Sequence, residues 1–272
     1  MKLKWTASPY IVWMIIFIVV PLLLVAVFAF TDGETGGFTL ANISHVSEFT
    51  PVLMRSIWLA AVATIASLVI AYPLAYIISR SSGSGRRTLL MLAILPMWMN
   101  FLLRTYAWMT LLENTGLINR LLGYIGLGPF QMINTQGAVV LGMVYNYLPF
   151  MILPLYSIMT KIQNTAIEAA QDLGANWVLV FYRVVLPLSA PGIRTGVTMV
   201  FVPAVSTFLI SRMLGGGGNL LIGDLIDLQF LGNAYNPNLG SAISLVLMVL
   251  ILLCMSIFNQ FGDEEEMEGM LL

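Results

Sequence analysis

Six long uncharged runs divide the chain, and they constrain its fold more than any other feature. A helix needs about 20 apolar residues to cross a lipid bilayer, and 59% of the 272 residues are hydrophobic while only 9% are charged. We therefore predict an all-α, polytopic membrane protein whose six transmembrane helices form a single domain, residues 1–272. The runs cover residues 10–30, 57–79, 88–103 with a continuation to 112, 137–160, 195–211 and 240–260.

The composition argues against several classes of function. The net charge of −1 gives no reason to expect a nucleic acid as a partner. Cys254 is the single cysteine and His45 the single histidine, so we expect no metal site and no cofactor. A membrane-embedded enzyme is disfavoured because the sequence has no His-Glu-x-x-His and no Gly-x-Ser-x-Gly. The four glycines at 215–218 precede no Lys-Ser or Lys-Thr, so they are not a nucleotide-binding loop.

Basic residues are distributed unevenly between the two sides of the predicted helices. Cytoplasmic loops of membrane proteins carry an excess of Lys and Arg. With a cytoplasmic N-terminus, eight basic residues fall on that side and four on the other, so we predict that both termini, including the acidic tail 262–272, are cytoplasmic. The two groups are Lys2, Lys4, Arg80, Arg86, Arg87, Lys161, Arg183 and Arg194, against Arg55, Arg104, Arg120 and Arg212.

The hydrophilic stretch 161–194 has the pattern of two short helices joined by a turn. Thr165-Ala-Ile-Glu168 predicts a capping box at the start of the first helix, and Gly174 predicts its end. The second helix is expected to run to Leu186-Pro187. This pattern fits equally a rigid contact with another protein and a loop on the lipid surface. The apolar faces comprise Ala166, Ala169, Ala170 and Leu173 in the first helix, and Trp177, Val178, Phe181 and Val184 in the second.

The same stretch carries a family resemblance. Glu168-Ala-Ala-x-x-x-Gly174, followed after nine residues by Val184-x-Leu186-Pro187, resembles the EAA motif of permease subunits of binding-protein-dependent ABC importers, with valine where isoleucine is common. The resemblance implies the type I importer permease fold and a coupling loop, residues 164–187, that docks into an ATP-binding subunit. The residues that it assigns to this coupling are Glu168, Ala169, Ala170, Asp172, Leu173, Gly174 and Pro187.

The resemblance also implies partners and a location. Such a permease is a non-catalytic subunit of the bacterial cytoplasmic membrane, surrounded by lipid. Its expected partners are two ATP-binding subunits, a second permease subunit and an extracytoplasmic substrate-binding protein. The chain has no Walker A sequence, so ATP hydrolysis would belong to the partner subunits.

A narrower resemblance concerns the solute. Pro96-Met-Trp-Met-Asn100 with Arg104-Thr-Tyr-Ala-Trp108, together with segments 148–156, 168–175, 219–223 and 229–231, is similar to permeases of polyamine importers of the spermidine/putrescine type. The segments at 96–108 and 148–156 also occur in permeases for other solutes, so another small solute stays open. A secondary carrier or channel is a further alternative, although a proton-coupled carrier usually places carboxylates or histidines inside its helices, and none is evident here.

Carboxylates and aromatic faces are the groups expected to bind polyamine ammonium groups. Arg104, a charge inside an apolar run, is interpreted as a structural ion pair or a gate element. The segment 219–231 is too short to span and is expected to lie at the external interface. Ordinary packing is the alternative for each aromatic residue. The candidates for the substrate path are Trp98, Asn100, Tyr145, Asn146, Tyr147, Asp224 and Asp227.

Overall fold

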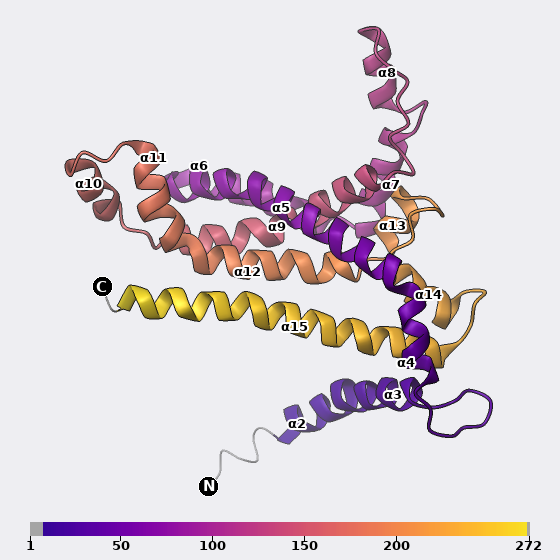
Figure 1. Ribbon diagram of the computed structural model, residues 1–272. Helices are drawn as coiled ribbons and strands as arrows, with labels where there is room; N and C mark the ends of the chain where they lie inside the picture. The colour runs from indigo at the N-terminus through magenta and orange to yellow at the C-terminus, as the bar shows by residue number, and fades with distance from the viewer. Residues whose placement is uncertain (1–7, 271–272) are drawn as a thin grey trace.

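The computed structural model describes the backbone of residues 8–270 and the side chains of residues 9–258. Lys2, Lys4 and the side chains of the acidic tail lie outside these residues. Figure 1 shows an all-helical arrangement, as predicted. Its elements are α2 (Ser8–Met14), η1 (Ile15–Val19), α3 (Val20–Ala29), α4 (Ala41–His45), η2 (Val46–Phe49), α5 (Thr50–Arg80), α6 (Gly83–Trp98), α7 (Phe101–Leu112), α8 (Leu117–Tyr124), α9 (Gln136–Met159), α10 (Asn164–Asp172), α11 (Trp177–Val180), η3 (Phe181–Val185), α12 (Leu186–Val205), α13 (Leu209–Leu214), α14 (Ile222–Leu231) and α15 (Pro237–Met270).

Five helical segments in the described part are long and apolar enough to cross a membrane, and a broken pair makes a sixth. This agrees with the six expected runs. The broken pair is Gly83–Trp98 with Phe101–Tyr124, bent by 92°. The five unbroken segments are Pro9–Ala29, Ala41–Arg80, Gln136–Met159, Trp177–Val205 and Pro237–Phe258.

Two predicted helices differ from the structure. The run 88–112 was expected to be one helix, but the chain turns at Met99 and Asn100, where the Asn100 side chain caps α7. The run 195–211 was expected to be the fifth helix, but α12 already begins at Leu186 and ends at Val205. Pro187 follows directly on the π-helical turn η3, so it lies inside one continuous helical segment, Trp177–Val205.

The core of the bundle is made by α5, α9 and α12, which pack along one another. Small residues permit this close packing, as is common between membrane helices. A Cβ added at Gly196 of α12 would lie 2.5 Å from the Met151 sulfur of α9. A Cβ at Gly192 would lie 3.1 Å from the Pro154 carbonyl oxygen. The two helices therefore approach closely at these glycines, where an added side chain would force a neighbouring atom to shift.

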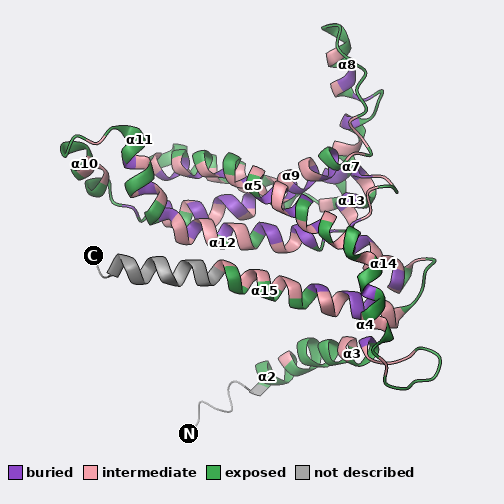
Figure 2. Ribbon diagram, in the orientation of Figure 1, coloured by how far each residue is buried: buried purple, intermediate pink, exposed green. Residues whose placement is uncertain are grey.

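The first apolar segment, α2 to α3, lies at the edge of this bundle. No residue in the most hydrophobic window of Pro9–Ala29 is buried. Figure 2 colours most of α2 and α3 as exposed. Within the described part, α3 packs mainly on α15. Its apolar surface therefore faces outward, where lipid or another membrane protein can cover it.

The short helices gather at opposite ends of the bundle. In Figure 1, α10 and α11 lie at one end, while α8, α13 and α14 lie at the other. The last turns of α15 and the start of α2 lie toward the α10 end. The predicted coupling loop and the predicted external segment 219–231 are thus separated by the length of the bundle.

Candidate coupling and translocation site

The first helix of the predicted coupling loop ends as the sequence indicates. Gly174 has a φ of 83°, the left-handed conformation that glycine adopts without steric cost. Its N–H donates to the Gln171 carbonyl at 2.8 Å, and the Ala175 N–H donates to the Ala170 carbonyl at 3.1 Å. These two bonds form a Schellman motif. The turn between α10 and α11 is therefore fixed by backbone bonds.

The start of this helix differs from the prediction. The expected capping box of Thr165 and Glu168 is absent, because α10 already begins at Asn164 and Gln163 is its N-cap residue. Gln163 makes no side-chain cap, and the Thr165 hydroxyl instead lies 3.3 Å from the Gln163 side-chain oxygen. Thr165 and Glu168 are thus inside the helix, where a capping box cannot form.

The small apolar face of α10 is divided between two environments. Ala170, together with Ile167, packs on a buried cluster of Ile162, Val180 and Val185. The other residues of this face are exposed, and the Leu173 side chain is 89% exposed. The four residues of the predicted apolar face are therefore not all exposed, because Ala170 packs α10 against the second helix. The exposed residues are Ala166, Ala169 and Leu173.

The remaining residues assigned to coupling stay near this turn. Glu168 and Asp172 are exposed on α10, and Pro187 is exposed in the first turn of α12. The second helix does not stop at Leu186-Pro187, as was expected, but passes through α11 and η3 into α12. The loop is therefore continuous with a core helix of the bundle.

An aromatic contact joins this second helix to α5. Trp177 stacks on Phe181, with ring centroids 5.7 Å apart, and Phe181 meets the Tyr72 ring edge-on at 5.5 Å. The Tyr72 hydroxyl lies 2.8 Å from the Ser189 hydroxyl of α12. Together with apolar residues of α5 and α12, these rings line a cleft of about 650 Å³. Of the predicted apolar side, Phe181 and Val184 are packed, whereas Trp177 and Val178 are exposed.

The candidates for the substrate path do not form one cluster. Trp98 is 89% exposed at the end of α6. Asn100 accepts the N–H of Leu102 at 2.9 Å, so its side chain serves as a helix cap. The structure therefore separates these two residues from the bundle core and supplies a structural role for Asn100.

Of the three candidates on α9, Asn146 is buried, while Tyr145 and Tyr147 are half-buried. Tyr145 meets Trp108 edge-on, with centroids 5.4 Å apart, and Tyr147 donates to the Pro203 carbonyl at 3.4 Å. Asn146 is buried; its amide donates to the Gly142 carbonyl at 2.9 Å, while its side-chain oxygen has no hydrogen-bond partner in the described part. Asn146 is therefore the interior polar group with free acceptor capacity on this helix.

Arg104 is buried in α7. Its side chain lies over the Phe101 ring, 5.8 Å from the centroid. Its Nε and Nη1 atoms have no hydrogen-bond partner, and the described residues supply no ion pair to it. The expected structural ion pair within this chain is not found among those residues. A buried charge without a partner is costly, and the role of Arg104 as a gate element stays a prediction.

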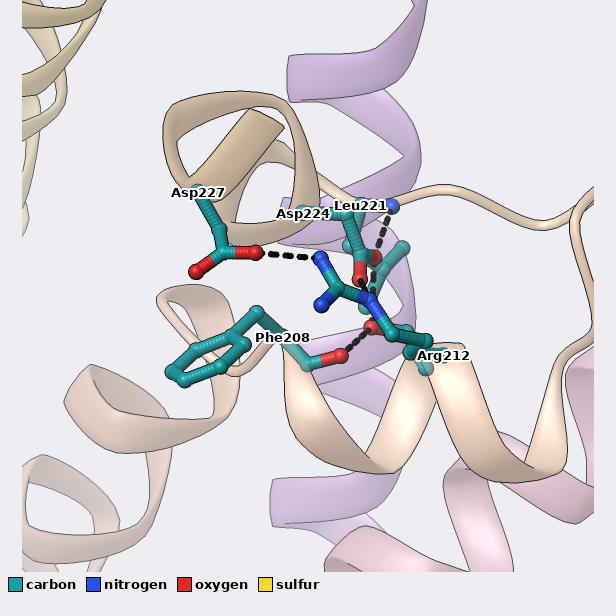
Figure 3. A network of polar contacts seen from close by, with 6 residues as sticks. Phe208, Arg212, Leu221, Asp224 and Asp227 are labelled. Carbon is teal, nitrogen blue, oxygen red and sulfur yellow. Dashed lines mark hydrogen bonds and ion pairs between the residues drawn. The ribbon is translucent and has the colours of Figure 1, made fainter. Parts of the chain in front are cut away.

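Asp224 and Asp227 are held by one arginine at the end opposite α10 (Figure 3). The fully buried Asp224 carboxylate accepts the Ser211 hydroxyl at 2.6 Å and the Leu221 N–H at 2.8 Å. Arg212 lies 3.9 Å from Asp224 and 2.5 Å from Asp227. Burial raises the pKa of Asp224 above its ordinary value, although the hydrogen bonds and Arg212 oppose this effect. The sequence did not indicate Arg212 as the partner of these carboxylates. It lies 15 residues before Asp227, and no helix or turn pattern pairs residues at that spacing.

The segment containing these carboxylates is not a helix on the lipid interface, contrary to the prediction. Leu221 and Ile222 are buried, and the Ile222 N–H donates to the Ser56 hydroxyl of α5 at 2.8 Å. A Cβ at Gly223 would lie 2.5 Å from the Ser206 carbonyl oxygen, beyond the end of α12. α14 therefore closes on the break between α12 and α13, where Leu225 packs against the core, whereas Leu231 at its end is 84% exposed.

Comparisons with known proteins place this architecture in a family. Residues 67–263 match the binding-protein-dependent transport system inner membrane component family. The chain is 38% identical over 266 residues to the spermidine/putrescine transport system permease protein PotB of Haemophilus influenzae, with 94% of this chain and 92% of that protein covered. It is 35% identical over 255 residues to PotB of Escherichia coli, with 90% and 92% covered.

A solved structure shares the fold. A chain of the bacterial alginate ABC transporter, in complex with an alginate pentasaccharide-bound periplasmic protein, superposes with a TM-score of 0.80 at 17% identity. The superposition covers 96% of this chain and 94% of that chain, which confirms the predicted importer permease fold. The chain described here therefore belongs to the binding-protein-dependent transport system inner membrane component family, the permeases of ABC importers.

Proposed function

We propose that this chain forms half of the translocation pathway of an ATP-driven importer of polyamines. The observation that carries the proposal is the 38% identity to a spermidine/putrescine permease across 94% of the chain. The pathway would be completed by a second permease subunit, and the polyamine would be delivered by an extracytoplasmic binding protein. The chain itself is a non-catalytic subunit, and two ATP-binding subunits hydrolyse ATP.

Within this proposal, α10 is the coupling helix that receives the motion of an ATP-binding subunit. Its exposed face of Ala166, Ala169 and Leu173 allows a partner surface to approach the helix backbone closely. The Schellman turn and the cluster around Ala170 keep α10 fixed to α11, which continues into α12. Closure of the ATP-binding subunits would therefore move α10, α11 and α12 together.

One observation favours a second candidate, an importer of an anionic or neutral solute. Arg104 is a buried cation without an ion-pair partner in the described part, and a positive charge along the path would repel a polyamine. Under the first proposal Arg104 lies outside the path and stabilises the assembly. Arg104→Met should then lower the yield of complex without changing which solutes are carried.

Reconstitution of the full complex in lipid tests the function. ATP hydrolysis should be stimulated by binding protein loaded with spermidine or putrescine, and not by the empty protein. Stimulation by a different solute and none by either polyamine would exclude the polyamine assignment. Absence of ATP-binding subunits from the purified complex would exclude the ABC permease mechanism.

Two charge additions on opposite faces of α10 test the coupling helix. Ala169→Arg places a cation on the exposed small face and should weaken capture of the ATP-binding subunits by about tenfold or more, because overpacking costs about 1–3 kcal/mol and each 1.4 kcal/mol is about a decade. Gln171→Arg adds the same charge on the polar face and should bind normally. Ala170→Arg is less informative, because Ala170 packs within the loop. Normal capture and stimulation in Ala169→Arg would mean that α10 does not dock.

A further inference from the structure

Arg80 connects the end of α5 to the start of α10. It is the last residue of α5, and its Nη1 atom donates to the Ile162 carbonyl at 3.1 Å and to the Asn164 side-chain oxygen at 2.5 Å. Ile162 lies just before α10, and Asn164 is the first residue of that helix. One guanidinium group thus bridges two segments separated by more than 80 positions in the sequence.

Packing around this bridge makes it more than a surface contact. The Arg80 guanidinium lies over the Tyr76 ring, 5.4 Å from its centroid. Tyr76 also packs against the cluster of Ile162, Val180 and Val185, the same cluster that anchors α10. The Nε and Nη2 atoms of Arg80 are buried without a hydrogen-bond partner among the described residues, so Nη1 alone makes the two polar contacts. The side chain is therefore enclosed between α5 and the coupling loop, with the planar group fixed by stacking and by two hydrogen bonds.

The connectivity of the chain gives this bridge its significance. α10 is joined covalently to α9 through residues 160–163 and to α12 through α11 and η3. The third core helix, α5, is not connected to α10 by a neighbouring segment of the chain, although it packs along both α9 and α12. At the cytoplasmic end, Arg80 supplies a polar connection between α5 and α10.

We infer that Arg80 is a positioning residue that makes α5 move together with the coupling helix. The inference rests on the proposed function of α10 as the element that receives motion from the ATP-binding subunits. Loss of the bridge leaves α10 able to dock, since its exposed face is unchanged. Loss of the bridge removes the contact that transmits the movement of α10 to α5. The ATP-binding subunits should then still dock, while stimulation of ATP hydrolysis falls.

The neighbouring arginines provide a control. Arg86 donates to the Ser81 and Ser79 carbonyls at 2.8 and 3.2 Å, so it caps the end of α5 itself. Arg87 is exposed and forms no hydrogen bond or ion pair with α10 among the described residues. Arg87→Gln thus removes the same charge from the same side of the bundle without touching the bridge.

The test uses the complete importer with Arg80→Gln, Arg80→Lys and Asn164→Ala, each compared with Arg87→Gln. Capture of the ATP-binding subunits should be normal in all four. Stimulation of ATP hydrolysis by loaded binding protein should fall in the first three by about 5- to 150-fold, the usual range of coupling between sites. Lysine is expected to rescue poorly, because an ammonium group has no planar face to stack on the Tyr76 ring. Stimulation in Arg80→Gln equal to that in Arg87→Gln would overturn the inference.

Hydrogen exchange separates this inference from the proposed function. Backbone amides of α10 should exchange faster in Arg80→Gln and Asn164→Ala than in Arg87→Gln, whichever solute the complex carries, because local opening becomes easier without the bridge. Unchanged exchange in both would overturn the bridge even if the importer works as proposed. Should Arg80→Gln fail to assemble, Asn164→Ala still decides, since it removes one acceptor and keeps the arginine.

Discussion

Asp224 illustrates how a buried carboxylate is kept in an apolar setting. Its side chain is completely buried, yet it accepts bonds from Ser211 and Leu221 and faces the guanidinium of Arg212. Burial alone disfavours the charged form, while these donors favour it. Burial is the largest effect, so the pKa of Asp224 is raised above its ordinary value of 3.8.

This shift predicts a pH dependence of stability. The raised pKa means that the folded protein holds the Asp224 proton more tightly than the unfolded chain does. The stabilisation is therefore fully present below about pH 3.8 and is lost as pH rises through the folded-state pKa. Asp224→Asn should remove this slope, measured as the thermal unfolding midpoint of the purified chain at a series of pH values. Asp227→Asn should keep it, and an unchanged slope in Asp224→Asn would assign the effect to another group.

Sequence reasoning succeeded at Gly174, whose role is local, and failed at the equally local capping box of Thr165 and Glu168. The left-handed conformation of Gly174 is predictable because the C-terminal motif of a helix involves only neighbouring residues in the sequence. The burial of Asp224 depends on Arg212 and Ser211, which lie 12 and 13 positions earlier and meet it only because α13 and α14 fold together. Likewise, no sequence pattern links Arg80 to Asn164, although a basic residue at a helix C-terminus is a recognisable signal.

At the scale of elements, the contacts of α9 with α13 and with α12 depend on missing side chains. Gly142 of α9 allows Leu214 and Ile210 of α13 to approach, since an added Cβ would lie 2.5 and 2.8 Å from them. Gly196 of α12 does the same for Met151. The hydropathy of the apolar runs predicted that the membrane helices exist. It did not indicate which face of each helix packs against its neighbours. The break at Asn100 was also hidden in hydropathy, although asparagine is a preferred N-cap residue.

Gly196→Ala and Gly137→Ala form a matched pair that tests the contact between α9 and α12. Alanine favours a helix interior over glycine by about 1 kcal/mol, a gain that applies at Gly196 and is smaller at Gly137, in the first turn of α9. At Gly137 the new Cβ meets only the Thr135 hydroxyl, at 3.7 Å, and stability should be kept or raised. At Gly196 it meets the Met151 sulfur at 2.5 Å, and overpacking of about 1–3 kcal/mol should lower stability. Thermal unfolding in detergent measures both, and equal midpoints would mean that α9 and α12 can separate at no cost.

At the scale of the whole molecule, one surface is conspicuously apolar. No residue of the most hydrophobic window within Pro9–Ala29 is buried, and among the described residues α3 packs mainly on α15. A membrane helix surrounded by lipid has no need of an apolar protein partner, since lipid is equally apolar. The sequence therefore predicted this helix correctly without indicating that it would stand at the edge of the bundle.

The orientation of the molecule in the membrane is a prediction that the arrangement of its ends makes testable. The excess of Lys and Arg places α10 and the loop between α5 and α6 in the cytoplasm. The loop before α4 and the loop after α14 lie at the opposite end of the bundle, so they should be external. Exposed positions exist on both sides, and Cys254 is the single cysteine, so Cys254→Ser gives a background for labelling.

Four single-cysteine variants decide the orientation. Glu34→Cys and Ala234→Cys should react with a membrane-impermeant maleimide in intact cells, because both positions are exposed at the predicted external end. Ser84→Cys and Gln171→Cys, exposed at the α10 end, should react only after the membrane is opened. Each variant must first support solute uptake, so that a misinserted chain is not scored. Labelling of Gln171→Cys in intact cells would place α10 outside, where no ATP-binding subunit could reach it, and the coupling mechanism would be excluded.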